Sequence, residues 1–429
     1  MECPICKEFD EKDNFACPNC NRENICGSHY DFDFLVCSEC ADKMRPAVKK
    51  KADVAKKAAP AAEGESDGTD PNEVFYVQKV KCPVCGTGGE QKWFKAKTYS
   101  ERNVDIDKHP QKYMWTDKAY EIFHPPLYYM WNCSNCNYTD SYVEFEKPDK
   151  DPFSNFRRLK DVFVDQYHDD LRIEKIIDKL GENINYEKMN YYQAIKLHLL
   201  GIFIQEMMED EEDRDYFKIG RYYLRLGWLY RELNEKEESN KKIKSTLEKL
   251  VMFLKKGWPD VVDNEVASMK NAITNLNKAF THSHAIKSVV AEVDLLMLIA
   301  GVHLKIDEQM EGLKLLNTVL ARGQKTKQIL ERKLKEAEKA EVAPPPEELR
   351  KFDIQLKKLD ALMGNARDTI SDIKSEQMKK EKKKALAIMK KLGERPPQEI
   401  REILIKKGID KRIALQLTPE EKKKFLGLF

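Results

Sequence analysis

The residues of this chain that could do chemistry are its cysteines, because all of them stand at the spacing of metal ligands. Ten of the eleven cysteines form five Cys-x-x-Cys pairs, and the remaining one, Cys26, is followed at the same spacing by His29. The candidate ligands are Cys3, Cys6, Cys17, Cys20, Cys26, His29, Cys37, Cys40, Cys82, Cys85, Cys133 and Cys136. Two sulfurs three residues apart can bind one zinc ion at about 2.3 Å each, and two such pairs complete its tetrahedron. The sequence therefore predicts three closed Zn2+ sites per chain.

Other uses of paired cysteines fit the sequence less well. Disulfides need an oxidising compartment, but the N-terminus lacks the basic and apolar pattern of a signal peptide, and no apolar run is long enough to span a bilayer. A redox pair would be expected once, beside a βαβ pattern, and a catalytic zinc site keeps one position open for water. We therefore expect a cytoplasmic protein without membrane insertion, in which zinc replaces hydrophobic cores too small to hold their segments folded.

Composition divides the chain into a metal-binding N-terminal part and a helical remainder. The 429 residues are 34% charged with a net charge of +2, which indicates a soluble protein of about three domains. The predicted fold class is multidomain and mainly α. Its parts are a binuclear treble-clef or cross-brace-like zinc module at 1–45, a flexible linker at 46–72, a split zinc ribbon with short β hairpins at 73–148, tetratricopeptide-like helices at 152–335, a coiled-coil helix at 346–392 and short C-terminal helices at 397–429.

The eight ligands of the first module can bind two ions in two arrangements. In the sequential arrangement the first two pairs share one ion, whereas in the interleaved arrangement the first and third pairs share it. The order of the ligands and the Cys-x-x-His third pair resemble cross-brace zinc fingers of the B-box, AN1 and RING kind, which favours interleaving. This resemblance implies a docking module. A small zinc-stapled knob is the alternative.

The second module has the pattern of a split zinc ribbon, in which each cysteine pair caps a hairpin and the metal joins the two hairpins. Its motifs are Cys-Pro-Val-Cys-Gly at 82–86 and Pro-Leu-Tyr-Tyr-Met-Trp-Asn-Cys-Ser-Asn-Cys-Asn-Tyr at 126–138. Together with Tyr-Leu-Arg-Leu-Gly-Trp-Leu-Tyr-Arg-Glu at 223–232, they resemble the bacterial family called domain of unknown function 2225, from about residue 80 to about residue 235. The resemblance implies a zinc ribbon with these four cysteine ligands, followed by tetratricopeptide-like helices, and it implies no activity.

The helical region also fits a tetratricopeptide template in part. Tyr223, Leu226, Gly227 and Tyr230 fill its first positions, and Ser239 falls at the small position of the following helix. Degenerate echoes occur at 197–204 and at 297–304. An ordinary helical bundle with apolar stripes is the alternative.

Two basic regions suggest contact with nucleic acid. Lysines alternate with aromatic residues between the two halves of the ribbon, but the net charge of 86–132 is only +1, so packing of the ribbon is the simpler explanation. From Lys374 to Lys424 there are seventeen basic and eight acidic residues, which gives +9. That tail could contact nucleic acid, a ribosome or an acidic protein, or it could be a solvated helix.

Two histidines and an acidic run in the helical region have simple explanations. We expect His282 and His284 at the surface, and the acidic run 209–213 in a solvated loop.

The segment after Pro344, Pro345 and Pro346 carries a narrow apolar seam. Apolar residues from Phe352 to Ile373 recur at alternating steps of four and three, so this helix must pair with another helix. We expect it to fold back on the preceding helix as an antiparallel hairpin, because an intramolecular partner costs less entropy than a second chain. The alternative is a dimer through the seam. The expectation favours a monomer.

Together these features predict a non-enzymatic adaptor or scaffold that binds partner proteins through helical repeats and zinc modules. The sequence has no recognisable nucleophile and base pair, phosphate-binding loop or open metal site, so no catalytic residue is predicted. The alternative function is a zinc-ribbon protein that associates with nucleic acid or with a ribosome through its basic tail.

Overall fold

A computed structural model describes residues 30–31, 36–37, 71–146, 155–208, 210–235, 237–282, 286, 288–339 and 345–419. Within the predicted N-terminal module it describes one short hairpin, β1 (Tyr30–Asp31) with β2 (Val36–Cys37). The other seven ligands of that module, the wiring of all eight, and most of the predicted linker lie outside the described residues.

Three antiparallel hairpins form the first part of the described chain. Their strands are β3 (Phe75–Lys81) with β4 (Gly88–Phe94), β5 (Tyr99–Val104) with β6 (Pro110–Trp115), and β7 (Met130–Asn132) with β8 (Thr139–Ser141). The second hairpin is the insert between the two cysteine pairs. Short 3-10 helices connect it to the third hairpin, among them η3 (Lys118–Ile122) and η4 (Pro125–Tyr128). Aromatic side chains from all three hairpins pack into one core, which explains why hairpins too short to be stable alone persist here.

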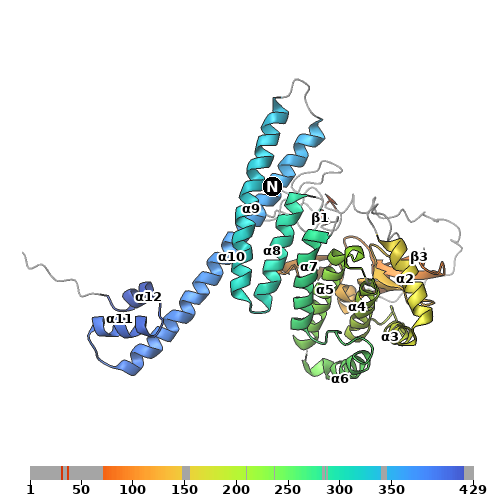
Figure 1. Ribbon diagram of the computed structural model, residues 1–429, viewed down its shortest axis with the longest axis horizontal. Helices are drawn as coiled ribbons and strands as arrows, with labels where there is room; N and C mark the ends of the chain where they lie inside the picture. Colours follow the sequence, from red (N-terminus) through yellow and green to blue (C-terminus); the bar gives the residue numbers. More distant parts are fainter. Residues whose placement is uncertain are drawn as a thin grey trace, which may run out of the picture.

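A body of α-helices follows the hairpins (Figure 1). Its helices are α2 (Phe156–Asp169), α3 (Leu171–Gly181), α4 (Tyr191–Glu206), α5 (Tyr216–Glu235), α6 (Glu237–Leu254), α7 (Glu265–His282) and α8 (Val289–Lys305). α4 is buried on nearly all sides and forms the centre of the body. Polar caps fix where several helices begin; the Asn190 side chain, for example, accepts a hydrogen bond from the Gln193 backbone N–H at the start of α4.

The pairing of α5 differs from the tetratricopeptide expectation. In a tetratricopeptide unit α5 would pack along the next helix, α6, whereas here it packs mainly along α7 and touches α6 only slightly. Two glycines permit this approach. A Cβ atom on Gly220 would lie 2.7 Å from Leu276 Cγ, and one on Gly227 would lie 2.7 Å from Met269 Cε. The motif at 223–230 therefore marks a close helix crossing, but the partner is the second helix along the chain.

The last helices form a hairpin and a long arm (Figure 1). α9 (Gln309–Glu338) and α10 (Pro346–Leu392) pack against each other, so the predicted fold-back across the three prolines is what the structure has. The seam is covered by more than one helix, however. Leu359 and Ile370 of α10 share a buried cluster with Leu330 of α9 and with Val293 of α8. The hairpin is thus anchored on the body by α8 and does not stand as an isolated two-helix coiled coil.

Beyond the hairpin, α10 continues to a small group of helices at its far end, α11 (Pro397–Lys406) and α12 (Lys411–Leu417). Gly408, with φ of 79°, makes the left-handed turn between them. The described residues contain no helix long and apolar enough to cross a membrane.

Candidate metal centre

Four of the twelve predicted ligands come together in the described residues. Cys82 and Cys85 lie in the turn between β3 and β4, and Cys133 and Cys136 lie in the turn between β7 and β8. The four Sγ atoms all lie within 4.8 Å of one another, with Cys82 Sγ 3.6 Å from Cys136 Sγ and Cys85 Sγ 3.6 Å from Cys133 Sγ. The split ribbon predicted from the spacing has therefore brought its two halves together.

The two cysteine turns have the same backbone geometry. In each turn the N–H of the residue after the second cysteine donates to the carbonyl of the first cysteine at 2.9 Å, from Gly86 to Cys82 and from Asn137 to Cys133. Both donors have a left-handed backbone, with φ of 74° and 59°, which glycine and asparagine tolerate best. This turn exposes both sulfurs of a pair on the same side. The residue types that follow the cysteines are therefore part of the site.

The spacing of the sulfurs fits one tetrahedral metal ion. Ligands at about 2.3 Å from a tetrahedral zinc ion would be about 3.8 Å apart, close to the separations observed. Without a cation the thiols oppose one another's ionisation, and hydrogen bonds to Cys133 and Cys82 together with burial raise the pKa of Cys136. A bound cation removes this conflict, because it keeps all four sulfurs as thiolates. The cluster can hold a single metal ion, and four thiolates in a tetrahedron are the donor set typical of zinc.

The family of the chain can be assigned at this point. The profile of a bacterial family, described as "Uncharacterized protein conserved in bacteria (DUF2225)", matches residues 75–341, which include all four cysteines and more than half of the chain. The chain belongs to this family. The DUF2225 region begins at β3 and ends just after α9, so it extends well beyond residue 235, where the recognisable motifs end. No curated protein and no solved structure matches the chain.

Within the DUF2225 region, the metal turn of β7 and β8 rests directly on the helical body. A Cβ atom on Gly181, at the end of α3, would lie 2.3 Å from Asn137 Oδ1, and a Cβ atom on Gly201 of α4 would lie 2.4 Å from Met130 Cε. The Asn137 side chain also donates to Asp178 of α3 at 3.0 Å. Glycine is required at these two helix positions because the ribbon approaches so closely. A metal ion held by the four cysteines would thus be mechanically connected to the packing of these helices.

A buried charge network supports the same junction. Asp140 of β8, which is fully buried, lies 3.2 Å from Lys218 Nζ and accepts a hydrogen bond from the Tyr222 hydroxyl, both on α5. Glu144 lies within 3.2 Å of Lys218 and 2.9 Å of Arg221. Burial alone would raise the pKa of Glu144, but these two cations outweigh it and lower that pKa to about 2. The paired charges fix the ribbon on α5.

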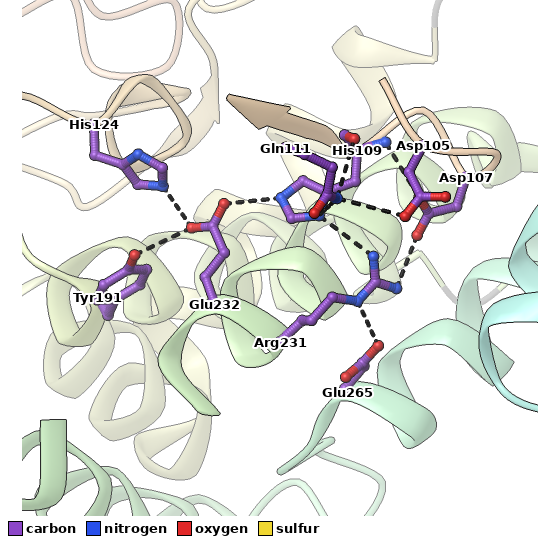
Figure 2. A network of polar contacts seen from close by, with 9 residues as sticks. All are labelled: Asp105, Asp107, His109, Gln111, His124, Tyr191, Arg231, Glu232 and Glu265. Atoms are coloured by element: carbon purple, nitrogen blue, oxygen red, sulfur yellow. Dashed lines mark hydrogen bonds and ion pairs between the residues drawn. The ribbon is translucent and has the colours of Figure 1, made fainter. Parts of the chain in front are cut away.

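Figure 2 shows a second polar cluster, centred on Glu232 of α5, that no sequence pattern indicated. One carboxylate oxygen of Glu232 lies 2.8 Å from His109 Nε2, and the other contacts His124 Nε2 and accepts from the Tyr191 hydroxyl at 3.2 Å. Burial alone would raise the pKa of Glu232, but hydrogen bonds to the two histidines outweigh it and lower that pKa to about 2. Both histidines belong to the inserted part of the ribbon. The cluster therefore ties this insert to the helices.

Arg231 extends the cluster to the turn between β5 and β6 and to α7 (Figure 2). Its Nη2 lies 2.8 Å from Asp107 Oδ2, and its Nε lies 2.7 Å from Glu265 Oε1. Its Nη1 lies 3.3 Å from His109 Nδ1. Because a guanidinium can only donate, His109 Nδ1 accepts in this contact, which leaves Nε2 as the ring nitrogen that donates to Glu232.

Histidine and carboxylate side chains such as these serve in acid–base catalysis and in metal binding. In this cluster, however, each of them already forms a hydrogen bond or an ion pair with a neighbouring side chain. Among the described residues, the four cysteines are the only group of three or more His, Cys, Asp or Glu side chains whose ligand atoms all lie within 4.8 Å of one another, and the two histidines with Glu232 do not meet that spacing. The aromatic residues of the insert are likewise used for packing. Trp93 stacks on Trp131 with ring centroids 5.5 Å apart, and Phe94 packs against Trp115 at the same distance. The packing explanation preferred for the insert agrees with these contacts. His284 and residue 209 lie outside the described residues.

Proposed function

We propose that the protein is a non-enzymatic zinc-binding adaptor that holds partner proteins on its helices, with the metal-bound ribbon as a structural support. The observation that carries this proposal is the ligand set of the metal centre. Four thiolates fill every position of a tetrahedral ion, so no position is left for the water that a hydrolytic zinc site requires. The ion in such a site stabilises the fold around it.

The helical body supplies the partner surface in this proposal. Arrays of stacked helices bind partners along the faces that neighbouring helices build together, as tetratricopeptide repeats do. α6 lies at the edge of the body and carries two adjacent exposed apolar side chains, Met252 (69% exposed) and Phe253 (37% exposed). Apolar side chains of this size on an outer helix favour contact with a protein partner.

The N-terminal module completes the proposal. We assign two further zinc ions to its eight ligands, in the interleaved arrangement, and a docking role of the cross-brace kind. With the ion in the ribbon, this gives three zinc ions per chain. The proposed setting is the cytoplasm, where thiols stay reduced and available to zinc.

Cross-linking of the tagged protein in its native host, followed by mass spectrometry, tests the proposal. We expect protein partners whose cross-links map to the helical body, and whose capture persists at about 0.3 M salt, where surface charges are largely screened. Capture should persist after nuclease treatment. It should fall when Met252 and Phe253 are changed to Asp, and persist when the exposed neighbours Lys249 and Lys256 are changed to Asp. Complexes that disappear on nuclease treatment would contradict the proposal.

A further inference from the structure

The far end of α10 forms a separate helical unit with α11 and α12, which we call the C-terminal knob (residues 379–419; Figure 1). The knob has a small buried core that is separate from the core of the helical body. In it, Ala385 of α10 packs against Leu404 of α11 and Ile413 of α12. The Glu381 carboxylate accepts a hydrogen bond from the Asp410 backbone N–H at 2.6 Å, which fixes α12 on α10. In the knob, α11 and α12 thus cover one face of α10, and the opposite face of α10 is exposed.

The exposed face of α10 in the knob carries a band of lysines. Residues three, four and seven apart share a helix face, and by this spacing the band lies opposite Ala385. It consists of Lys379, Lys380, Lys383, Lys384, Lys390 and Lys391, all exposed. Lys380 pairs with Glu376 at 2.8 Å. Within the described chain the other five lysines have no carboxylate within 4.0 Å. Five of the six lysines of the band thus carry a positive charge that no ion pair within the described chain neutralises.

The rest of the molecule has the opposite charge. Residues 374–429 contain seventeen basic and eight acidic residues, a net charge of +9, and the whole chain has +2, so residues 1–373 have +2 minus +9, which is −7. Ile373 is the last residue of α10 that packs on the buried cluster of α8 and α9. From there the helix rises about 9 Å to Lys379 and about 27 Å to Lys391. The near end of the band thus lies about one Debye length, roughly 8 Å at physiological salt, from that cluster and the far end about three, so the rest of the molecule weakens the field of the band least at Lys390 and Lys391.

We propose that this lysine band binds the phosphate backbone of double-stranded nucleic acid. A duplex carries a charge about every 1.7 Å along its axis, and the lysines of the band, interrupted on this face at Ala387, can contact phosphates along such a line. The knob, residues 379–419, contains no Phe, Tyr or Trp, so it has no surface on which unpaired bases could stack, which disfavours a single strand. A membrane surface fits less well, because the apolar face of α10 that would insert is covered by α11 and α12.

The binding would be independent of base sequence. Lysines on a helix face contact phosphates as point charges, and no side chain of the band is of the planar type that reads base edges in pairs. The protein would therefore bring partners held on its body to any duplex region. This role is separate from the adaptor function, since the band can bind a duplex whether or not the helical body binds a protein.

Fluorescence anisotropy of the full chain with a labelled duplex of about 24 base pairs tests the inference, because the salt dependence of binding counts the phosphates contacted. The test variant changes Lys383, Lys384, Lys390 and Lys391 to Gln. The matched control makes the same change at Lys241, Lys242, Lys249 and Lys256, four exposed lysines of α6 and its end without an ion pair in the described chain. Gln has nearly the helix propensity of Lys, so both variants should keep their helicity by circular dichroism.

We expect duplex binding that weakens steeply with salt. Loss of four phosphate contacts should lower the slope of log affinity against log salt by up to about 3.6 and reduce affinity at least tenfold at 0.1 M salt, with the control unchanged. Equal affinity of the test variant and the control would overturn the inference. So would tighter binding of a single strand of equal length, or binding of vesicles that contain phosphatidylglycerol, or of a poly-glutamate peptide, without binding of the duplex.

Discussion

Individual residues of this protein differ in how far their role can be predicted from local spacing. Cys82 and Cys85 are three residues apart, so their shared turn is a local property of the sequence and the metal site follows from it. Glu232 has partners 108 and 123 residues away, and no spacing rule connects them. The functional residues that the sequence analysis did not predict share one signal. Several of them are polar or charged residues at helix positions that the surrounding apolar pattern predicts to be buried, and a buried charge requires a partner.

The metal ligands give the first prediction. Cys133→Ser removes one thiolate from the four-sulfur cluster, so the chain should lose one of its zinc ions and the ribbon should unfold, because the binding energy of a structural ion is folding energy. Ser134→Ala, at an exposed position in the same turn, is the matched control and should keep its zinc. Elemental analysis counts the ions, and three per chain are expected in the wild type. A metal-replete protein with only one zinc ion would contradict the assignment.

The second prediction concerns Glu232 and pH. Its folded pKa of about 2 lies below the ordinary value of 4.5, so its ionised form stabilises the folded state above pH 4.5, and this contribution is lost as pH falls toward 2. Glu232→Gln should therefore destabilise the protein at pH 7, on the order of 3 kcal/mol. The difference from wild type should shrink as pH falls from 4.5 to 2.

Urea unfolding at a series of pH values measures this effect. Glu248→Gln, at an exposed position on α6, is the control and should change stability little at any pH. A difference between wild type and Glu232→Gln that stays constant from pH 7 to pH 2 would show that the carboxylate charge is not what stabilises the cluster.

At the scale of elements, helix existence was predictable but helix pairing was only partly so. The proline-bounded seam predicts both α10 and its fold-back on α9, because a narrow apolar stripe and a short connection leave few choices. The glycine motif of α5 predicts a close crossing but does not say with which helix. The tetratricopeptide template assigns α6, whereas α7 has the complementary side chains, Met269 and Leu276, at the two glycines. Pairing between non-adjacent helices depends on the shape of both surfaces, which one helix cannot specify.

The third prediction tests this crossing. At Gly227 a larger side chain must displace Met269, so Gly227→Leu should destabilise the protein by roughly 1–3 kcal/mol. Gly364 of α10 provides the matched control, because a Cβ atom there meets nothing within 4 Å. Gly364→Leu should stabilise by up to about 1 kcal/mol through helix propensity alone. Thermal melts of the full chain separate the two, and a raised midpoint for Gly227→Leu would contradict the crossing.

At the scale of the whole molecule, the junction between the ribbon and the helical body extends to α10. Asp294 of α8 lies 2.8 Å from Lys108 Nζ of the inserted hairpin and 3.1 Å from Lys358 Nζ of α10. The turn before β6 also rests on α8, since a Cβ atom on Gly301 would lie 2.3 Å from the Ile106 carbonyl oxygen. The DUF2225 match ends just after α9, at residue 341, although α9 shares its buried seam with α10, which lies outside the match. A truncation at the family boundary would therefore expose that seam.

The state of the seam gives the last prediction. Leu359 is fully buried and Ile370 is 8% exposed, within one chain. Changing both to Asp should lower the melting temperature of the full protein, because two charges would enter a core shared by α8, α9 and α10. The mass in solution should stay that of a monomer in wild type and variant alike, since the seam already has its partner within the chain.

The control for these seam substitutions is Ala361→Asp with Ala387→Asp, both at exposed positions on α10, which should change the melting temperature much less. Light scattering decides between the arrangements: a wild-type dimer that becomes monomeric only on the seam substitutions would mean that α10 pairs between chains, and that the fold-back on α9 is not the arrangement in solution.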